Sequence, residues 1–126
     1  MANQRSAPVY LDLFRIRLPV AAVTSIAHRL SGVLMFSSFP FLIYLLGISL
    51  QGPAGYEQAG NYLQTIWLRA GSVIIAWSLF HHLFSGIRNL LIDIDCGVSL
   101  QQARRSAWLA NIAGLAMALA WLWWIL

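Results

Sequence analysis

The sequence contains no lysine, only one cysteine and only four acidic residues among its 126 positions. The single cysteine, Cys96, excludes an internal disulfide and a metal cluster held by several cysteines of this chain. The eight basic residues are all arginines, and they are scattered among apolar residues. The chain therefore lacks the polybasic tract of a nucleic-acid-binding protein, and we expect no nucleic-acid partner.

Charge of either sign is scarce, because charged residues make up 10% of the chain and hydrophobic residues make up 60%. The mean hydropathy is +0.69, whereas a soluble domain carries roughly a quarter charged residues. A soluble core of this size is too small to bury such an excess of apolar side chains. Two stretches of membrane-spanning length are almost continuously apolar, and a third is interrupted by two histidines. These runs predict a protein whose main solvent is lipid.

We expect an all-α integral membrane protein that forms a single domain over residues 1–126. Three transmembrane helices are predicted at residues 19–50, 66–92 and 107–126, after a cytoplasmic or interfacial lead-in over residues 1–18.

Individual residues support these limits. Pro19 suits the first turn of a helix, and Pro40 is expected to kink the first span modestly. Residues 51–64 contain a Gly-Pro pair and are predicted to form a polar loop. The last span ends on Trp123 and Trp124, which are typical of an aromatic belt at a membrane surface.

The distribution of arginine predicts the orientation of the spans. Arg69 alone falls on the side of the connection between the first and second spans, and the other seven arginines fall on the opposite side. By the positive-inside rule, the N-terminus is cytoplasmic and the C-terminus is periplasmic. The first residues lack the features of a secretory signal peptide, so we expect a multi-pass protein of the bacterial inner membrane. The seven arginines are Arg5, Arg15, Arg17, Arg29, Arg88, Arg104 and Arg105.

A first polar cluster lies where the first span enters the membrane. Ser25 and Arg29 are four residues apart and therefore lie on one helical face, with Gly32 one turn further on. A hydroxyl and a guanidinium beside a glycine would form a donor-rich pocket for a quinone carbonyl, and would stabilise negative charge on its oxygen. Alternatively, Arg29 extends to lipid headgroups and Ser25 caps the helix.

A second polar cluster surrounds His81 and His82 in the second span. Polar residues inside a membrane are costly, so each is a candidate for function. The face of His82 is rich in small residues that leave room for a flat macrocycle, whereas Trp77 and Phe84 crowd the face of His81. A neutral imidazole is a usual axial ligand of haem iron, so His82 is the better candidate. In the alternative interpretation, both histidines hydrogen-bond to neighbouring helices.

Both clusters lie in motifs that resemble the signatures of one family, the cytochrome b556 subunits of succinate dehydrogenase. Residues 25–32 (SIAHRLSG) resemble the family's S-x-x-H-R-x-S-G signature. Residues 82–88 (HLFSGIR), followed by Asp93, resemble its H-x-x-x-G-I-R signature, which an aspartate follows shortly. The spacing of the motifs, the three spans, the chain length and the lead-in at residues 8–13 are also similar. The resemblance therefore covers nearly the whole chain.

The resemblance implies a membrane anchor of respiratory complex II. One haem b would lie between this chain and a second small three-helix anchor subunit, with one axial histidine from each, here His82. Ser25 and Arg29 would bind the quinone, ubiquinone or menaquinone, and His28 and Arg29 would contact the haem propionates. Asp93 would support the quinone site or its proton supply. An iron–sulfur subunit and a flavoprotein subunit would dock on the cytoplasmic face and deliver electrons from succinate.

The sequence departs from the family pattern at two positions. The lead-in begins Ala7-Pro8 where relatives usually have Arg-Pro, and Asn89 replaces a histidine that many relatives carry after G-I-R. Asn89 can donate a neutral hydrogen bond but carries no charge for a propionate. His81 has no role in the family and is expected to be structural.

A model in which His28 and His82 both ligate one iron is also considered. His28 adjoins Arg29 at the predicted interface, whereas His82 lies roughly 10 Å deeper if depth is counted from Arg88 at 1.5 Å per residue. We therefore expect the second axial ligand to come from another subunit.

Three other functions remain open. An anchor of a quinol:fumarate reductase would have the same architecture, but its complex would catalyse the reverse reaction. A small transporter usually has an ionisable carboxylate in mid-membrane, whereas Glu57, Asp93 and Asp95 all lie in predicted loops. A haem-free scaffold would use both clusters only for helix packing.

Overall fold

The computed structural model describes residues 18–126, so residues 1–17, including the lead-in motif at residues 8–13, lie outside the described part. The described part folds into four helices, α1 (Val20–Ser49), α2 (Pro53–Leu63), α3 (Ile66–Asp93) and α4 (Leu100–Ile125). Helices α1, α3 and α4 are long and apolar enough to cross a membrane. For this part of the chain, the prediction of an all-α protein with three such helices is confirmed.

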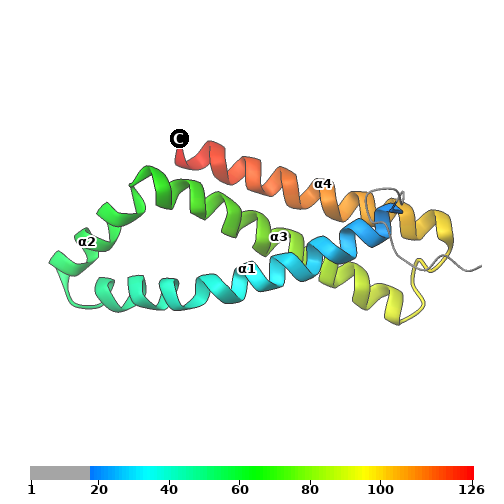
Figure 1. Cartoon of the computed structure of the whole chain (residues 1–126), viewed down its shortest axis with the longest axis horizontal. Helices are drawn as coiled ribbons and strands as arrows, with labels where there is room; N and C mark the ends of the chain where they lie inside the picture. Colours follow the sequence, from blue (N-terminus) through cyan, green and yellow to red (C-terminus); the bar gives the residue numbers. More distant parts are fainter. Residues whose placement is uncertain (1–17) are drawn as a thin grey trace, which may run out of the picture.

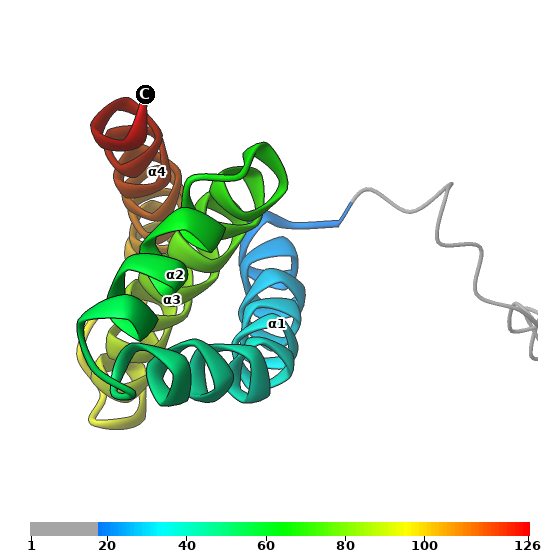
Figure 2. The same cartoon turned by 90° about the vertical axis from the view of Figure 1, so that its left-hand side faces the viewer.

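Helix α3 lies in the middle, with α1 along one side and α4 along the other (Figure 2). The start of α1, the end of α3 and the start of α4 lie at one end of the molecule (Figure 1). The opposite end holds α2, the start of α3 and the end of α4 (Figure 1). Helix α1 runs without a break through Pro40 and bends along its length (Figure 2).

Small side chains dominate the interior. The fully or almost fully buried apolar residues of α3 and α4 are alanines, and large apolar side chains point outward instead. Small residues allow membrane helices to approach closely, because packing rather than water exclusion holds them together. The exposed leucines, isoleucines and phenylalanines form an apolar outer surface that is suited to contact with lipid. The buried alanines are Ala76, Ala107, Ala110 and Ala118.

The predicted polar loop at residues 51–64 is wrong, because most of it is the helix α2. Gly52 has a positive φ of 113°, which lets the chain turn sharply after α1. Pro53 then occupies the first helical position, where its missing N–H costs no hydrogen bond. The Gly-Pro pair therefore starts a helix here.

Helix α4 begins at Leu100, seven residues before the predicted start of the third span at residue 107. Ser99 caps the helix, since its side chain accepts a hydrogen bond from the backbone N–H of Gln102. Its hydroxyl also donates to the side-chain oxygen of Gln102 at 2.8 Å. The spacing of Ser99 and Gln102 is that of a capping box, and it is a sequence signal for the observed start of the helix.

Candidate functional site

The two helices that carry the sequence motifs meet at a pair of histidines. His28 of α1 and His82 of α3 stack their rings, with centroids 4.0 Å apart and planes inclined by 20°. Both side chains are half-buried. The structure therefore brings together the predicted axial ligand and one of the predicted propionate contacts.

The ring of His82 is held in one orientation by α1. Its Nδ1 lies 3.1 Å from the backbone oxygen of His28 and 3.2 Å from Oγ of Ser31. A carbonyl oxygen can only accept a hydrogen bond, so Nδ1 carries the hydrogen and donates it. In this tautomer the lone pair is on Nε2, which has no hydrogen-bond partner among residues 18–126. Metal-binding histidines are typically fixed in this way, with the second nitrogen donating to a carbonyl.

Ser31 is a site residue to which the sequence motif assigns no role. It is fully buried, and its hydroxyl donates to the backbone oxygen of His28 at 2.7 Å. The same oxygen atom accepts from His82, so Ser31 connects the α1 backbone to the ring on α3. The signal for this role is the serine–glycine pair that closes the first motif.

Glycines allow this close contact on both helices. A Cβ atom added to Gly32 would lie 3.1 Å from Cε1 of His82, which is tighter than an ordinary van der Waals contact. A Cβ atom on Gly86 would lie 3.7 Å from Nε2 of His28. Each helix therefore presents a glycine to the histidine of the other.

An apolar cavity of about 540 Å³ opens beside His82, between α1 and α3. Ligand and cofactor sites commonly have volumes of roughly 300–1,000 Å³ with mostly apolar walls. Phe36 and Phe39 on the α1 wall remain 82% and 61% exposed, so a further chain has room to cover the cavity. The remaining α1 and α3 walls include Met35, Ile75 and Leu79.

The predicted difference in depth between His28 and His82 is wrong, because the stacked rings lie at the same level. That estimate took Arg88 as a marker of the membrane surface. The guanidinium of Arg88 instead donates to Oγ of Ser106 and to the backbone oxygen of Ala103, so it serves the contact between α3 and α4. Two axial ligands must lie on opposite sides of an iron, and face-to-face rings at 4.0 Å do not meet this condition.

Ser25 and Arg29 lie exposed on α1. At 100° per residue, they occupy the same helical face as Gly32 and Phe36, which line the cavity beside His82. Ser25 and Arg29 therefore continue the α1 wall of this cavity toward the start of the helix. Their hydroxyl and guanidinium donors are open to a ligand or a partner chain on that side.

Asp93 and Asn89 lie near the end of α3, and both are exposed. The end of α3 and the start of α1 lie at the same end of the molecule (Figure 1). Among residues 18–126, no hydrogen bond joins Asp93 to Ser25 or Arg29, so the described part does not connect it to the first cluster. The side-chain oxygen of Asn89 accepts a hydrogen bond from Arg88 at 3.2 Å.

His81 lies on the opposite side of α3 from this cavity, against α4. It is 2% exposed, its Nε2 lies 3.0 Å from the side-chain oxygen of Asn111, and Trp77 stacks on its ring. Since an amide oxygen can only accept, Nε2 donates this bond. These contacts agree with the expected structural role.

Gly114 of α4 provides the space for His81 and carries a stability prediction. A Cβ atom there would lie 3.0 Å from Cα and Cβ of His81 and 3.2 Å from its backbone nitrogen. Because backbone atoms cannot rotate away, Gly114→Ala should destabilise the packing of α3 and α4 by about 1–3 kcal/mol. Gly47→Ala is the matched control, since a Cβ atom there meets nothing within 4 Å. Thermal unfolding of the two purified variants measures the difference; equal melting temperatures would contradict this packing.

Comparison with known proteins agrees with the motifs and the fold. Residues 2–124 match the model of a family described as the succinate dehydrogenase/fumarate reductase transmembrane subunit. A succinate dehydrogenase cytochrome b556 subunit of Coxiella burnetii is 31% identical over 120 residues, covering 92% of this chain and 96% of the relative. The corresponding subunit of Paracoccus denitrificans is 31% identical over 115 residues, covering 89% and 85%. The mitochondrial cytochrome b560 subunit of Mus musculus is 25% identical over 123 residues, covering 93% and 67%. The chain therefore belongs to the family of succinate dehydrogenase/fumarate reductase transmembrane subunits and is a multi-pass membrane protein.

Proposed function

We propose that this chain is the cytochrome b anchor of a succinate:quinone oxidoreductase, in which it contributes one axial ligand to haem b and part of the quinone site. The observation that carries the proposal is the orientation of His82. Its Nδ1 donates to α1, which leaves the lone pair of Nε2 available beside an apolar cavity. The isolated chain is not expected to be catalytic.

The residues around His82 fit a haem. The cavity of about 540 Å³ has apolar walls, and its only histidine is the one whose ring is fixed by a second-sphere hydrogen bond. Haem b bound there would pass single electrons toward the quinone. The stack on His28 and the contact with Gly32 keep the His82 ring from rotating out of position. His28 and Arg29 are the proposed contacts for the propionates.

The second axial histidine is proposed to come from a second small three-helix anchor subunit. The chain has three histidines in total. His28 stacks on His82 in a geometry that does not suit two ligands of one iron, and His81 is buried against α4. The exposed phenylalanines at the cavity give the partner subunit an apolar surface to cover.

The quinone is proposed to bind at Ser25 and Arg29. The serine hydroxyl and the arginine N–H groups would donate hydrogen bonds to a quinone carbonyl oxygen and stabilise its negative charge as electrons arrive. Both side chains extend the wall that begins at Gly32 and Phe36, so a quinone bound to them would lie near the cavity beside His82. Asp93, at the same end of the molecule, is proposed to support proton supply.

The relatives named as succinate dehydrogenase subunits favour succinate oxidation over fumarate reduction as the physiological direction. An iron–sulfur subunit and a flavoprotein subunit are the proposed electron-delivering partners. Purification of this chain from native membranes in mild detergent tests the assignment. The expected result is co-purification of these two subunits and the second anchor subunit, together with succinate-driven quinone reduction. Co-purification of subunits that oxidise quinol with fumarate would instead support the alternative direction.

The N-terminus is proposed to be cytoplasmic and the C-terminus periplasmic. Four of the arginines, Arg29, Arg88, Arg104 and Arg105, belong to the end where α1 starts, whereas Arg69 lies near the start of α3 at the other end. A reporter fused after Leu126 should therefore be periplasmic, and one inserted near Gly97 should be cytoplasmic. The opposite labelling would remove the basis for placing the quinone site near the electron-delivering subunits.

A further inference from the structure

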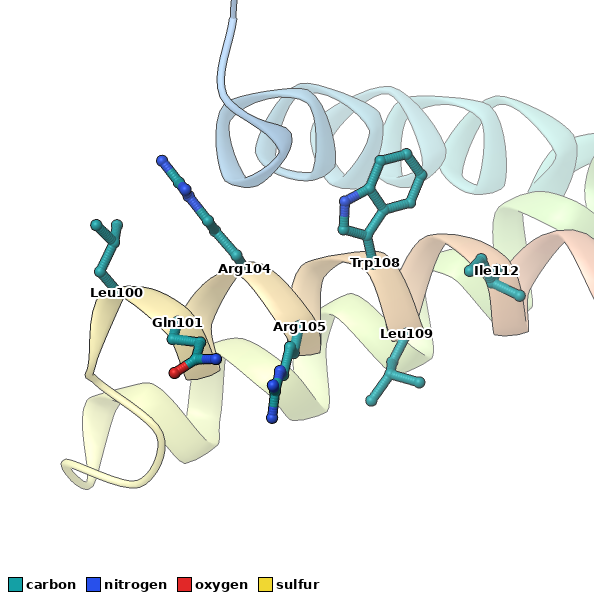
Figure 3. A pocket seen from close by; sticks show the side chains of 7 residues that line it. All are labelled: Leu100, Gln101, Arg104, Arg105, Trp108, Leu109 and Ile112. Atoms are coloured by element: carbon teal, nitrogen blue, oxygen red, sulfur yellow. The ribbon is translucent and has the colours of Figure 1, made fainter.

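A second cavity, of about 600 Å³, follows the first three turns of α4. Arg104 and Trp108 project from one side of the helix toward the start of α1, and Arg105 and Leu109 project from the other side (Figure 3). This α4 groove, lined by Gln101, Arg104, Arg105, Trp108, Leu109 and Ile112, has no lining residue in common with the cavity beside His82.

The two arginines of the α4 groove are available to bind a ligand. Among residues 18–126, neither Arg104 nor Arg105 makes a side-chain hydrogen bond or an ion pair, and both are exposed. Arg88, by contrast, donates to three acceptors. The groove itself contains no aspartate or glutamate. One arginine on each side of the groove, with no carboxylate in its lining, favours an anionic ligand such as a phosphate group.

The position of the groove along α4 indicates which parts of a lipid lie beside it. Trp123 and Trp124, 84% and 82% exposed, mark the opposite membrane surface at the far end of the helix. Trp123 lies 19 positions after Arg104, and Trp124 lies 19 positions after Arg105. A helix of this length spans about 28 Å, which is close to the hydrocarbon thickness of roughly 30 Å. Arg104 and Arg105 therefore lie at the level of the headgroups. Leu109 and Ile112, one to two turns further on, lie at the level of the acyl chains.

We propose that the α4 groove binds an anionic phospholipid of the leaflet at this end of the molecule. The phosphate group lies in the groove between Arg104 and Arg105, whose positive charges attract it from the two sides. Trp108 packs at the glycerol level, and Leu109 and Ile112 contact an acyl chain. The inference requires only that α4 crosses a membrane, and it does not depend on the proposed haem or quinone sites.

Native mass spectrometry of the whole detergent-purified complex tests this site. The complex is stripped of lipid and titrated with phosphatidylglycerol or with phosphatidylcholine carrying the same acyl chains. The wild-type complex should bind phosphatidylglycerol more tightly than phosphatidylcholine. Arg104→Gln and Arg105→Gln should each weaken phosphatidylglycerol binding about fivefold, the factor expected for one cationic side chain near an anionic headgroup. Arg104→Lys should keep most of the affinity, because the charge remains.

Arg69→Gln is the matched control, since it removes one arginine near the start of α3, at the opposite end of the molecule from the groove. It should leave phosphatidylglycerol binding within the error of the wild type. Equal binding of the two lipids by the wild-type complex would overturn the proposal without any variant. An equal loss in the Arg69 variant would also overturn it. Release of a soluble subunit from the Arg104 and Arg105 variants with unchanged lipid binding would show that a protein occupies the groove instead.

Discussion

Replacement of His82 by alanine should abolish the low-spin haem signal of the assembled complex. The chain has no other histidine that lines the cavity between α1 and α3, so no residue of the same type can replace the lost ligand. The reduced-minus-oxidised absorption spectrum and the haem content of the purified complex measure the effect. Retention of a bis-histidine spectrum in the His82→Ala complex would contradict the assignment of the ligand.

Variants around His82 distinguish the ligand from the residues that position it. Ser31→Ala removes a side chain that braces the ring at 3.2 Å, and loss of such second-sphere contacts typically weakens metal binding about 10–100-fold. His28→Ala should keep the low-spin spectrum with at most a shifted potential, because the stacked ring supports His82 without replacing it. Met35→Leu is the matched control, since Met35 lines the same cavity and leucine has a similar volume. Its haem content should equal that of the wild type.

Loss of the hydrogen-bond donors Ser25 or Arg29 on α1 should strongly lower quinone reduction. Ser25→Ala or Arg29→Ala should lower succinate-driven quinone reduction by about 10²–10³-fold, the usual effect of removing a donor to a developing oxyanion. Electron transfer from the soluble subunits to an artificial acceptor should persist, because that route bypasses the membrane site. Parallel assays on the same membranes measure quinone reduction and reduction of the artificial acceptor separately.

Two controls accompany this experiment. Ser37→Ala removes another exposed serine of α1 that lines none of the cavities described above, and Arg69→Ala removes an arginine at the other end of the molecule. Both should retain quinone reduction. Equal loss of both activities in the Ser25 or Arg29 variant would indicate failed assembly. Full quinone reduction in the Arg29→Ala complex would rule out the proposed quinone contact.

The three long helices were predictable because each contains an apolar stretch of spanning length. Helix α2 was missed because it is short and only weakly apolar, and because the Gly-Pro pair before it also fits a turn. The early start of α4 was missed because its first turns are polar. There the capping pair Ser99 and Gln102 is a better guide than hydropathy.

The two motifs of the candidate site could be predicted from the sequence, but the contact between them could not. Apolarity alone does not determine how α1 and α3 are aligned, since lipid-facing surfaces tolerate many alignments. The contact depends on Gly32 facing His82 and Gly86 facing His28. Depth counted from arginines failed because Arg88 bonds to α4 and so does not mark the membrane surface.

The most direct measurement is the haem spectrum of this chain expressed alone and together with the second anchor subunit. Because only His82 is placed to ligate an iron in the cavity, the isolated chain should bind no stable six-coordinate haem. Co-expression should produce a low-spin bis-histidine spectrum that His82→Ala removes. A low-spin bis-histidine haem in the isolated chain, abolished by His28→Ala, would contradict the shared site.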